Sequence, residues 1–199
     1  MKTANVEFLH KKKEETQAEV PDENLLYACE AGELESLGLL FERHRDTVYR
    51  FLSRLSGTNE QDLDDLVQTT FLELKRSART FRGRSSVKSW ILGIAANVAR
   101  HHIRGEVRQR KLMGAYGKIS NETMSSPQKS AEHSELLRRL AGEIDKLPYK
   151  LRVVFVLCSM EGMSGTEAAQ VLGLRPGTVR RRLHESRKRL RRAFEWSEK

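Results

Sequence analysis

The sequence of 199 residues is poor in cysteine and has no long apolar run. Its two cysteines, Cys29 and Cys158, lie far apart in the chain and have no CxxC spacing. We therefore expect buried free thiols instead of a disulfide or a metal site. The longest apolar run, residues 153–158, is far shorter than the roughly 20 residues that a membrane-spanning helix needs. Because the N-terminus also lacks an apolar signal core, we expect a cytoplasmic protein without a membrane span.

The residue groupings that enzymes use are also missing from the sequence. It offers no pair of nucleophile and base, no glycine-rich loop to cradle a phosphate and no cluster of metal ligands. His101 and His102 are adjacent, so a helix would place them on different faces, which disfavours a metal pair. The acidic residues at 60–65 are not accompanied by a glycine-containing calcium loop. We therefore expect no catalytic site, no metal and no cofactor.

Positive charge is what the chain has in excess. Its 36 Lys and Arg residues against 27 Asp and Glu residues give a formal net charge of +9. This charge favours a nucleic acid or another acidic partner, and by itself it also fits a membrane surface. The excess is greatest at residues 175–192, where arginines and one lysine are opposed only by Glu185. Because a guanidinium group binds phosphate or the O6 and N7 edge of guanine with two hydrogen bonds, we expect DNA as the partner.

The sequence around this basic stretch predicts two short helices joined by a tight turn. Ser164 and Glu167 have the spacing of a capping box, which starts the first helix. Gly173 ends it. Small Ala169 and apolar Val179 allow the two helices to pack closely, which predicts a helix-turn-helix unit that presents its second helix to a major groove. A solvated basic helix in an ordinary helical hairpin is the alternative interpretation.

Apolar residues recur at helical spacing through most of the remaining chain. This periodicity predicts helices near residues 25–29, 37–55, 60–80, 87–104 and 136–147. The run from Val153 to Leu157 has the propensity of a strand, but it is short, lacks a hairpin partner and leads into the helix-turn-helix, so we predict a helix. Periodicity is lost from Gly105, where glycine and serine begin to accumulate, which indicates a flexible linker. The predicted fold is all-α, with two small helical domains joined by this linker.

A polar stripe runs along the predicted helix near residues 60–80. Asp65, Gln68, Thr69 and Leu72 follow one another along it at helical spacing, opposite the apolar face. Acidic residues near a helix N-terminus are favoured by the helix dipole, so a well-capped surface helix explains the acids at least as well as a partner-binding face does. From the residues alone both interpretations stay open.

A second polar face lies on the predicted helix near residues 87–104. Asn97, Arg100 and Arg104 share it, and the preceding loop carries Arg82 and Arg84. An arginine face beside an arginine-bearing loop is a plausible track for nucleic-acid phosphates. Trp90 belongs to the apolar stripe of the same helix, and we expect it to pack in the core instead of stacking on a base.

Two separated stretches of the chain resemble one known family. They are DLDDLVQTTFLELKRSARTFRGRSSVKSWILGIAANVARHHIR and LPYKLRVVFVLCSMEGMSGTEAAQVLGLRPGTVRRRLHESRKRL. Together they resemble the two conserved domains of bacterial extracytoplasmic-function (ECF) sigma factors, the small branch of the sigma-70 family. The resemblance covers roughly residues 23–193, in the family's order and with a linker where the family has one.

This resemblance implies a division of the chain and a function. The implied parts are a flexible tail at 1–22, sigma region 2 at 23–107, a linker at 108–134 and sigma region 4 at 135–199. The implied function is that of an alternative sigma factor, which binds core RNA polymerase through the clamp of its largest subunit and directs promoter-specific transcription initiation. Promoter DNA is the second implied partner, and an anti-sigma factor, typical of the family, is a third.

The resemblance also implies three sets of binding residues. Binding of core polymerase falls to Asp62, Asp65, Gln68, Thr69 and Leu72. Reading and melting of the minus-ten element fall to Arg82, Arg84, Ser85, Ser86, Lys88, Asn97, Arg100 and Arg104, with a flipped base held by the loop and anchored by Asn97. Reading of the minus-thirty-five duplex falls to Arg175, Thr178, Arg180, Arg181, His184 and Arg187, the last of these on phosphate.

The sequence departs from the family pattern at several positions. Val87 stands where an aromatic residue is common, and Gly93 where arginine often occurs. Thr69 stands where glutamate is common, and Lys75 where tryptophan often occurs.

Two other functions are weighed against the sigma factor. A stand-alone helix-turn-helix repressor or activator would leave the first domain without a task, and a basic helical interaction or adaptor protein would explain the charge but not the capping box and glycine turn together.

Overall fold

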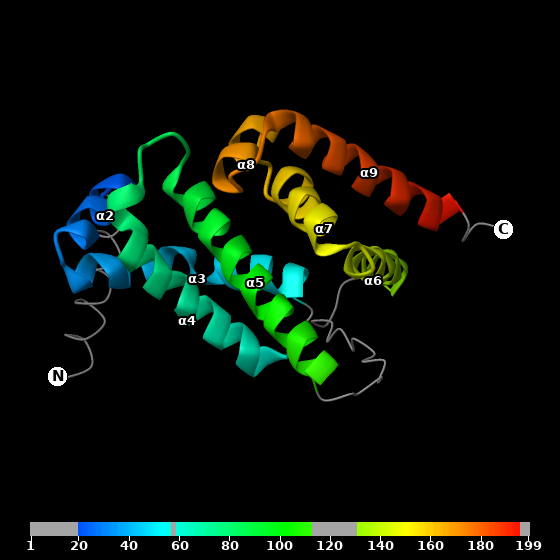
Figure 1. The fold of residues 1–199 in the computed structure, drawn as a ribbon, viewed down its shortest axis with the longest axis horizontal. Coiled ribbons are helices and arrows are strands. Elements are labelled where there is room, and N and C mark those ends of the chain that lie inside the picture. The colour runs from blue at the N-terminus through cyan, green and yellow to red at the C-terminus, as the bar shows by residue number, and fades with distance from the viewer. Residues whose placement is uncertain (1–19, 57–58, 113–130, 196–199) are drawn as a thin grey trace.

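The structure, a computed structural model, describes residues 20–56, 59–112 and 131–195. Figure 1 shows these residues as two groups of helices, α2 to α5 on one side and α6 to α9 on the other. Within the described ranges there is no strand. The all-α prediction is therefore confirmed for them, whereas the tail at 1–19 and most of the linker lie outside the described residues.

The first group packs around a core of large apolar side chains. Its elements are α2 (Asp22–Glu30), α3 (Leu34–Ser56), α4 (Glu60–Ser77), the short 3-10 helix η1 (Ala78–Thr80) and α5 (Val87–Leu112). The side chains that are wholly buried here include Leu26, Leu40, Phe51, Leu52, Leu55, Leu74, Ile91 and Leu92. Burying one side chain of this size stabilises a fold by about 1.5–3 kcal/mol relative to exposing it. These positions share the helical spacing from which the helices were predicted.

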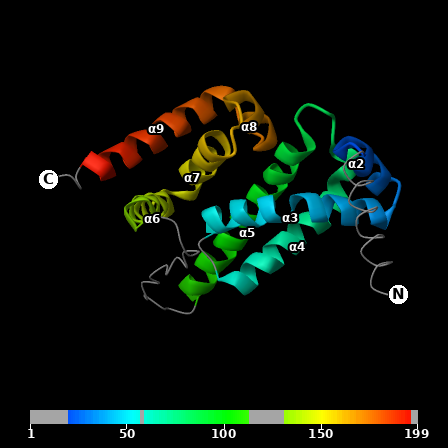
Figure 2. The same cartoon turned by 180° about the vertical axis from the view of Figure 1, so that it is seen from behind.

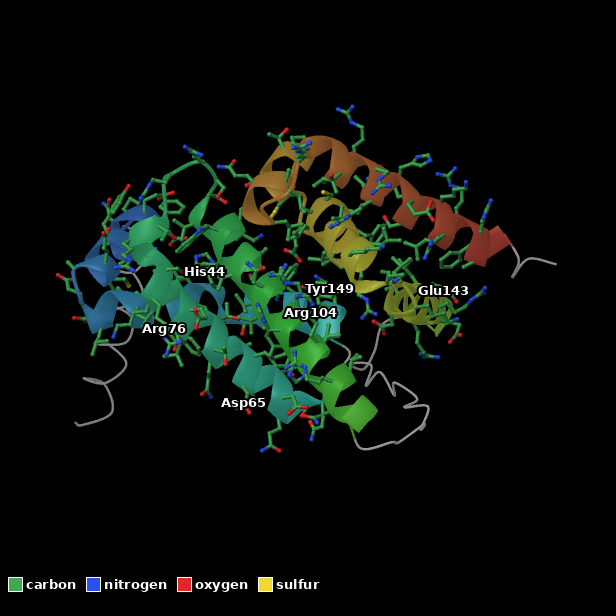
Figure 3. The ribbon with its side chains drawn as sticks, in the orientation of Figure 1. His44, Asp65, Arg76, Arg104, Glu143 and Tyr149 are labelled. Carbon is green, nitrogen blue, oxygen red and sulfur yellow. The ribbon has the colours of Figure 1, made fainter. Side chains whose placement is uncertain are left out.

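A cluster of three polar residues holds α2 against α3. Arg43 Nη1 donates to Asp22 Oδ1 at 2.8 Å, and His44 Nε2 lies 2.6 Å from Asp22 Oδ2. Burial by itself would raise the pKa of Asp22, but the hydrogen bonds from Arg43 and His44 outweigh it and lower the pKa below its ordinary value. Arg43 Nη1 also donates to the Val20 carbonyl, at 2.6 Å. This cluster, where Figure 3 labels His44, fixes the start of the described chain on α3.

The second group is smaller and is built on shorter helices. Its elements are α6 (Ala131–Asp145), α7 (Tyr149–Phe155), a π-helical turn η2 (Val156–Met160), α8 (Gly165–Val171) and α9 (Pro176–Glu195). Val154, Leu157, Ala168 and Val179 are fully buried and form its centre. The run 153–157 is helical, as predicted, because its apolar side chains point to one small core and have no neighbouring strand to pair with within the described residues.

The C-terminal part of α5 corrects the sequence prediction. We expected helical periodicity to end at Gly105 and the linker to begin at 108, but α5 continues to Leu112. Residues 106–112 are mostly strong helix formers, and His102 Nε2 lies 3.8 Å from Glu106 Oε1, one turn further along the helix and beyond the glycine. One glycine costs a helix only about 1 kcal/mol, which this surrounding propensity offsets.

The two groups of helices are in contact with each other. α8 packs against α5, and α3 meets α6, α7 and η2. Figures 1 and 2 show α8 beside the N-terminal half of α5 from opposite sides, with α9 on the outside of the molecule. The second group therefore lies on the helix that carries much of the predicted minus-ten surface.

Candidate nucleic-acid and protein interfaces

The predicted helix-turn-helix unit is formed by α8 and α9. Ser164 is the N-cap of α8, and its hydroxyl oxygen accepts from the Glu167 amide at 3.1 Å. Gly173 has a φ of +63°, a left-handed conformation that glycine adopts at no steric cost and that turns the chain toward α9. Ala169 is 2% exposed and Val179 is wholly buried, so the two helices meet at the predicted positions. These elements of the motif are confirmed.

The basic side chains of α9 face solvent. The exposed members of the predicted minus-thirty-five set are Arg175, Arg180, Arg181, His184 and Arg187, while Thr178 is half-buried. Arg187 Nη2 donates to Ser159 Oγ at 3.3 Å, which ties it to the preceding η2 turn. Glu185 accepts from Arg189 at 2.8 Å, and this hydrogen bond lowers its pKa. The one acidic side chain among the arginines of residues 175–192 is thus already occupied by a neighbour, and the remaining arginines present a positive surface.

The loop before α5 brings two further arginines to the surface. Arg82 and Arg84 are exposed on either side of Gly83, whose φ is +63°. Arg82 Nη1 donates to the carbonyls of Arg79 and Phe81, at 2.7 and 3.1 Å, so its guanidinium is held close to the loop. Ser86 accepts from the Ser89 amide at 3.1 Å and so begins α5.

The members of the predicted minus-ten set on α5 differ in exposure. Asn97 and Arg104 are exposed, whereas Arg100 is half-buried and its buried Nε atom has no hydrogen-bond partner. Arg100 and Arg104 both lie close enough to Tyr149 of α7 to act on its pKa, which burial raises far above its ordinary value. Figure 3 labels Tyr149 and Arg104 side by side. The second domain therefore reaches this part of the predicted DNA surface.

Trp90 packs next to the loop. Its ring lies 5.3 Å from the ring of Phe81, measured between centroids, and the two planes are tilted by 60°. Phe81 is 6% exposed, and Trp90 is half-buried against the core. The expected core role of Trp90 is confirmed, and its contact with Phe81 fixes one end of the arginine-bearing loop on α5.

The polar stripe of α4 is exposed between two hollows. Asp65, Gln68 and Thr69 are exposed, and Leu72 is 55% exposed. Gln68 and Leu72 line a groove of about 570 Å³ between α3 and α4. Thr69 lines another of about 610 Å³ between α4 and α5, which Asn97 also borders. Figure 3 labels Asp65 on the side of α4 that is turned away from α9. The stripe and the basic helix thus face different directions.

Asp62, predicted with this stripe, has a local structural role. Asn59 caps α4 by accepting from the Asp62 amide at 2.8 Å, and its side-chain amide donates to Asp62 Oδ2 at 3.1 Å. The Asp62 side chain is half-buried in this arrangement. The structure therefore separates Asp62, which helps to start the helix, from the four residues that are fully presented to solvent.

The two cysteines are free thiols in the structure. Cys29 is buried and Cys158 is half-buried, and burial raises the pKa of each. Among the described residues there is also no group of three potential metal ligands. The expectation of unpaired thiols is confirmed.

Sequence reasoning missed a set of residues that join the two domains. The first domain contributes Arg54 of α3. The second contributes Tyr149 and Arg152 of α7 and, from the segment around α8, Glu161 and Glu167. Their partners lie between 53 and 107 residues away in the chain. Because the partners are so far apart in the chain, no local sequence pattern predicts these contacts. They are seen only in the folded structure.

Comparison with protein families matches both domains. The family described as Sigma-70 region 2 matches residues 40–109, and the family described as Sigma-70, region 4 matches residues 137–190. The first match contains α4, the arginine-bearing loop and most of α5. The second contains the helix-turn-helix unit.

Two curated relatives are sigma factors of the ECF type. The chain is 30% identical to the ECF RNA polymerase sigma factor SigM of Mycobacterium tuberculosis over 172 residues, which cover 86% of this chain and 83% of SigM. It is 35% identical to SigE of Mycolicibacterium smegmatis over 154 residues, or 76% of this chain. This match spans 59% of the length of SigE.

Solved structures share the arrangement of helices. CnrH, determined in complex with the cytosolic domain of CnrY, has a TM-score of 0.62 and 28% sequence identity, covering 87% of this chain and 97% of CnrH. The sigma factor RpoE of Bartonella quintana, determined with the anti-sigma factor NepR, has a TM-score of 0.64 at 21% identity. That match covers 81% of this chain and 98% of RpoE. In the part of the chain that the structure describes, no helix is both long and apolar enough to span a bilayer.

Proposed function

Because the chain belongs to the ECF branch of the sigma-70 family, we propose that it is an alternative sigma factor that binds core RNA polymerase and directs promoter-specific transcription initiation. Sigma factors are non-enzymatic transcription factors, so phosphodiester chemistry belongs to the polymerase. The chain supplies recognition and strand opening and has no catalytic site of its own. Its place of action is the cytoplasm, where core polymerase and promoter DNA meet.

One observation carries the assignment of roles. Most arginines of α9 are exposed on a complete helix-turn-helix unit, while the polar stripe of α4, with Asp65, is exposed on another side of the molecule (Figure 3). A regulator that binds duplex DNA alone needs the first surface and has no use for the second. A sigma factor needs both, since it holds polymerase and promoter at the same time.

The three predicted residue sets acquire separate tasks in this proposal. Asp65, Gln68, Thr69 and Leu72 dock on the polymerase clamp, and the groove lined by Gln68 and Leu72 receives an apolar side chain of the partner. The loop around Gly83 and the face with Asn97 bind the minus-ten strand as it opens. The exposed residues of α9 read the minus-thirty-five element in the major groove.

Each DNA task has a physical basis in its side chains. Arg175, Arg180 and Arg181 are exposed near the N-terminal end of α9, which is the end that a recognition helix brings to base edges. Arg187 lies further along the helix and is tied to Ser159, a position suited to phosphate. The exposed arginines of the loop around Gly83 can bind phosphates, and beside Asn97 they suit a single strand whose bases have left the stack.

An anti-sigma factor completes the set of proposed partners. CnrH and RpoE, which share this fold, were both determined with a bound protein, and the partner of RpoE is named as an anti-sigma factor. The exposed Leu72 and the groove beside it offer this chain an apolar site of the kind that such a partner covers. Co-expression with candidate membrane or cytosolic partners, followed by co-purification, tests this part of the proposal.

In vitro transcription tests the function itself. Core polymerase is assayed with and without the full chain on a library of promoter fragments, and the transcripts are sequenced. We expect initiation at a defined subset of promoters only when the chain is present. Duplex binding without core binding or initiation would instead support a stand-alone regulator. Binding to an acidic protein without any DNA binding would support an adaptor.

A further inference from the structure

The groove between α3 and α4 is apolar and open to solvent. Its volume is about 570 Å³, and its apolar walls are formed by Leu34, Leu37, Leu39, Phe41, Phe71 and Leu72. The rings of Phe41 and Phe71 pack edge to face with their centroids 4.9 Å apart, and Phe71 is only 4% exposed. Leu34 and Leu72, in contrast, are 64% and 55% exposed. Two large side chains left open to water around one groove indicate a surface that an apolar partner covers.

A glycine of α3 leaves room at this groove. Gly38 lines the groove in the interior of α3, although glycine is among the poorest helix formers. A close neighbour often explains a glycine within a helix, but a Cβ atom at position 38 would meet no described atom within 4 Å. Packing inside the described fold therefore does not require this glycine. Its effect is to keep space free where a side chain would narrow the groove.

The rim of the groove is acidic. Glu35 and Glu42 are exposed and lie seven residues apart on α3, which places them on one face of the helix about 10 Å from each other. Within the described residues neither carboxylate is paired with a cation, since the adjacent Arg43 binds Asp22 instead. The walls thus favour an apolar occupant, and the rim favours one with a basic flank.

The chain itself carries a segment of this composition ahead of its first described residue. Between Lys2 and Glu19 the large apolar residues are gathered at Val6, Phe8 and Leu9. His10 and three consecutive lysines, 11–13, follow directly, and the one acid within residues 6–13 is at position 7. Residues 6–13, which we call the VEFLHKKK segment, therefore combine an apolar cluster with a basic flank.

This segment is joined to the fold close to the groove. Arg43 Nη1 donates to the carbonyl of Val20, the first described residue, at 2.6 Å. Leu39 and Glu42, which line the groove, lie within the same turn of α3 as Arg43. The residues between the segment and Val20, 14–19, span up to about 20 Å when extended, and the groove follows α3 from 34 to 42 for about 12 Å. The segment is therefore long enough to reach the groove and to lie along it.

We propose that the VEFLHKKK segment occupies the groove between α3 and α4 in the free chain, with Phe8 and Leu9 against the leucines and with the lysines beside the acidic rim. The inference rests on the proposed function only for the identity of the competitor. Gln68 and Leu72 border the same groove and belong to the surface that is proposed to dock on core polymerase. The segment and the polymerase thus bind one site, and the chain carries its own competitor for it.

A weak contact is sufficient for this competition because both parts belong to one chain. A short connection gives the segment an effective concentration of about 1 mM at the groove. An intrinsic Kd of about 0.1 mM then fills the groove for about nine-tenths of the time. A partner that binds only the empty groove loses about tenfold in apparent affinity, and a partner of high affinity still displaces the segment.

Photo-cross-linking in the full chain tests where the segment lies. The photoreactive analogue p-benzoylphenylalanine replaces Phe8, and the cross-linked peptides of the monomer are identified by mass spectrometry. We expect cross-links to residues 34–42 of α3 and 68–72 of α4. Cross-links only elsewhere in the chain, or none, would overturn the proposal. Cross-links only between two chains would overturn it as well, by assigning the segment to a second copy.

Filling the groove from within provides a matched pair of variants. Gly38→Leu adds a side chain to the groove, whereas Gly105→Leu adds the same side chain on α5, where a Cβ atom also meets no described atom within 4 Å. Leucine is the better helix former at both positions, so circular dichroism should show that each variant keeps its helices. We expect the cross-links from position 8 to fall about tenfold in Gly38→Leu only. Equal yields in the two variants would show that the segment does not need the groove.

A charge exchange tests the rim without changing the walls. Glu35→Lys with Glu42→Lys places two cations beside the basic flank of the segment, so the yield of cross-links from position 8 should fall. Replacing the three lysines at 11–13 with glutamate in the same chain restores opposite charges and should recover most of the yield. An unchanged yield in the rim variant would contradict the charge match that selects this occupant, and the proposal would fail.

Binding of core polymerase separates this inference from the proposed function. Phe8→Ser with Leu9→Ser empties the groove, so this chain should bind core about tenfold more tightly than a control with Thr3→Ser and Thr16→Ser. Equal affinities would overturn the competition. If the unmodified chain initiates transcription but its cross-links miss the groove, the function holds and the inference is wrong. If the cross-links reach the groove but no variant binds core, the inference holds and the function is wrong.

Discussion

The two domains present their predicted DNA surfaces in different ways. α9 lies on the outside of the molecule (Figure 1), and most of its arginines are exposed. The N-terminal half of α5 lies under α8, and Lys88 is in contact with Glu161. Most of the predicted minus-ten residues are nevertheless exposed, among them Arg82, Arg84 and Asn97. The second domain therefore borders the minus-ten surface, whereas nothing in the described residues borders the outer face of α9 in the same way.

This difference follows from how each surface is built. The helix-turn-helix unit comes from about 30 consecutive residues, so its helices have each other as neighbours in any arrangement of the chain. The minus-ten surface combines a loop with one face of a helix, so its parts are brought together only when α5 and the preceding loop are folded on each other.

The largest effect on stability is expected at the buried guanidinium of α7. Arg152 is 13% exposed, donates to the Leu55 carbonyl and lies 3.4 Å from Asp145 Oδ1. Burial raises the pKa of Asp145 and lowers that of Arg152, and the attraction between the two charges opposes both shifts. Arg152→Ala should lower the free energy of unfolding of the second domain by about 3 kcal/mol.

Urea denaturation followed by circular dichroism measures this loss. Lys150→Ala is the matched control, because Lys150 is a basic residue on the same helix that is exposed. Its effect should stay within about 0.5 kcal/mol. Equal midpoints for the two variants would show that the guanidinium adds nothing, and the contact between α7 and α3 would then have to rest on apolar packing.

The next effect in size concerns DNA recognition by α9. Arg180→Ala should weaken binding to a preferred upstream duplex by about 1–3 kcal/mol and relax the preference at one base pair, since a bidentate contact to guanine is lost. Fluorescence anisotropy with the preferred and a scrambled duplex measures both. Lys188→Ala, at another exposed position of the same helix, should weaken the two duplexes alike. The same uniform loss for Arg180→Ala would place Arg180 on phosphate.

A smaller effect is expected at the polar stripe of α4. Asp65→Ala with Gln68→Ala should weaken core association by about 1–2 kcal/mol, because two polar contacts in the docking face are removed. Glu60→Ala with Gln61→Ala is the control, since it removes an acid and an amide from exposed positions one turn earlier. Titration of labelled core polymerase gives both affinities. An unchanged affinity in the first double variant would remove this face from the docking surface.

The smallest effects compare one helix cap from each domain. Asn59→Ala and Ser164→Ala each remove a side chain that accepts from a first-turn amide, at 2.8 and 3.1 Å, and each should cost about 1 kcal/mol of stability. Urea denaturation followed by circular dichroism measures both losses. An unchanged midpoint in either variant would show that the cap adds nothing to the stability of its domain.

The helix-turn-helix unit was predictable because its signals are local. One short stretch contains a helix cap at Ser164, a turn at Gly173 and a packing position at Val179. The C-terminal end of α5 was not predictable in the same way, because Gly105 indicates a helix end whereas the helix formers that follow it favour continuation. The polar stripe of α4 was found as a pattern, but its exposure and the grooves beside it emerge only when α3 and α5 are in place.

The contacts between the domains were beyond the reach of sequence patterns for a different reason. Glu161 and Arg54 are separated by 107 residues, and each also fits an ordinary exposed position. Gly93 was noted as a departure from the family pattern, yet a glycine within a helix carries no information about what lies against it. Its role is defined by Val171, which belongs to another domain.

Two of the interdomain contacts have an evolutionary consequence. The Tyr149 hydroxyl and the Arg152 guanidinium both end on main-chain carbonyls, those of Ala96 and Leu55. Every residue type supplies such a carbonyl, so substitutions at those two positions need no compensating change in α7. Residue covariation between the domains would therefore under-report this interface, even in lineages that keep it. Its trace would be one-sided: tyrosine and arginine would be retained at 149 and 152 whichever residue types supply the two carbonyls.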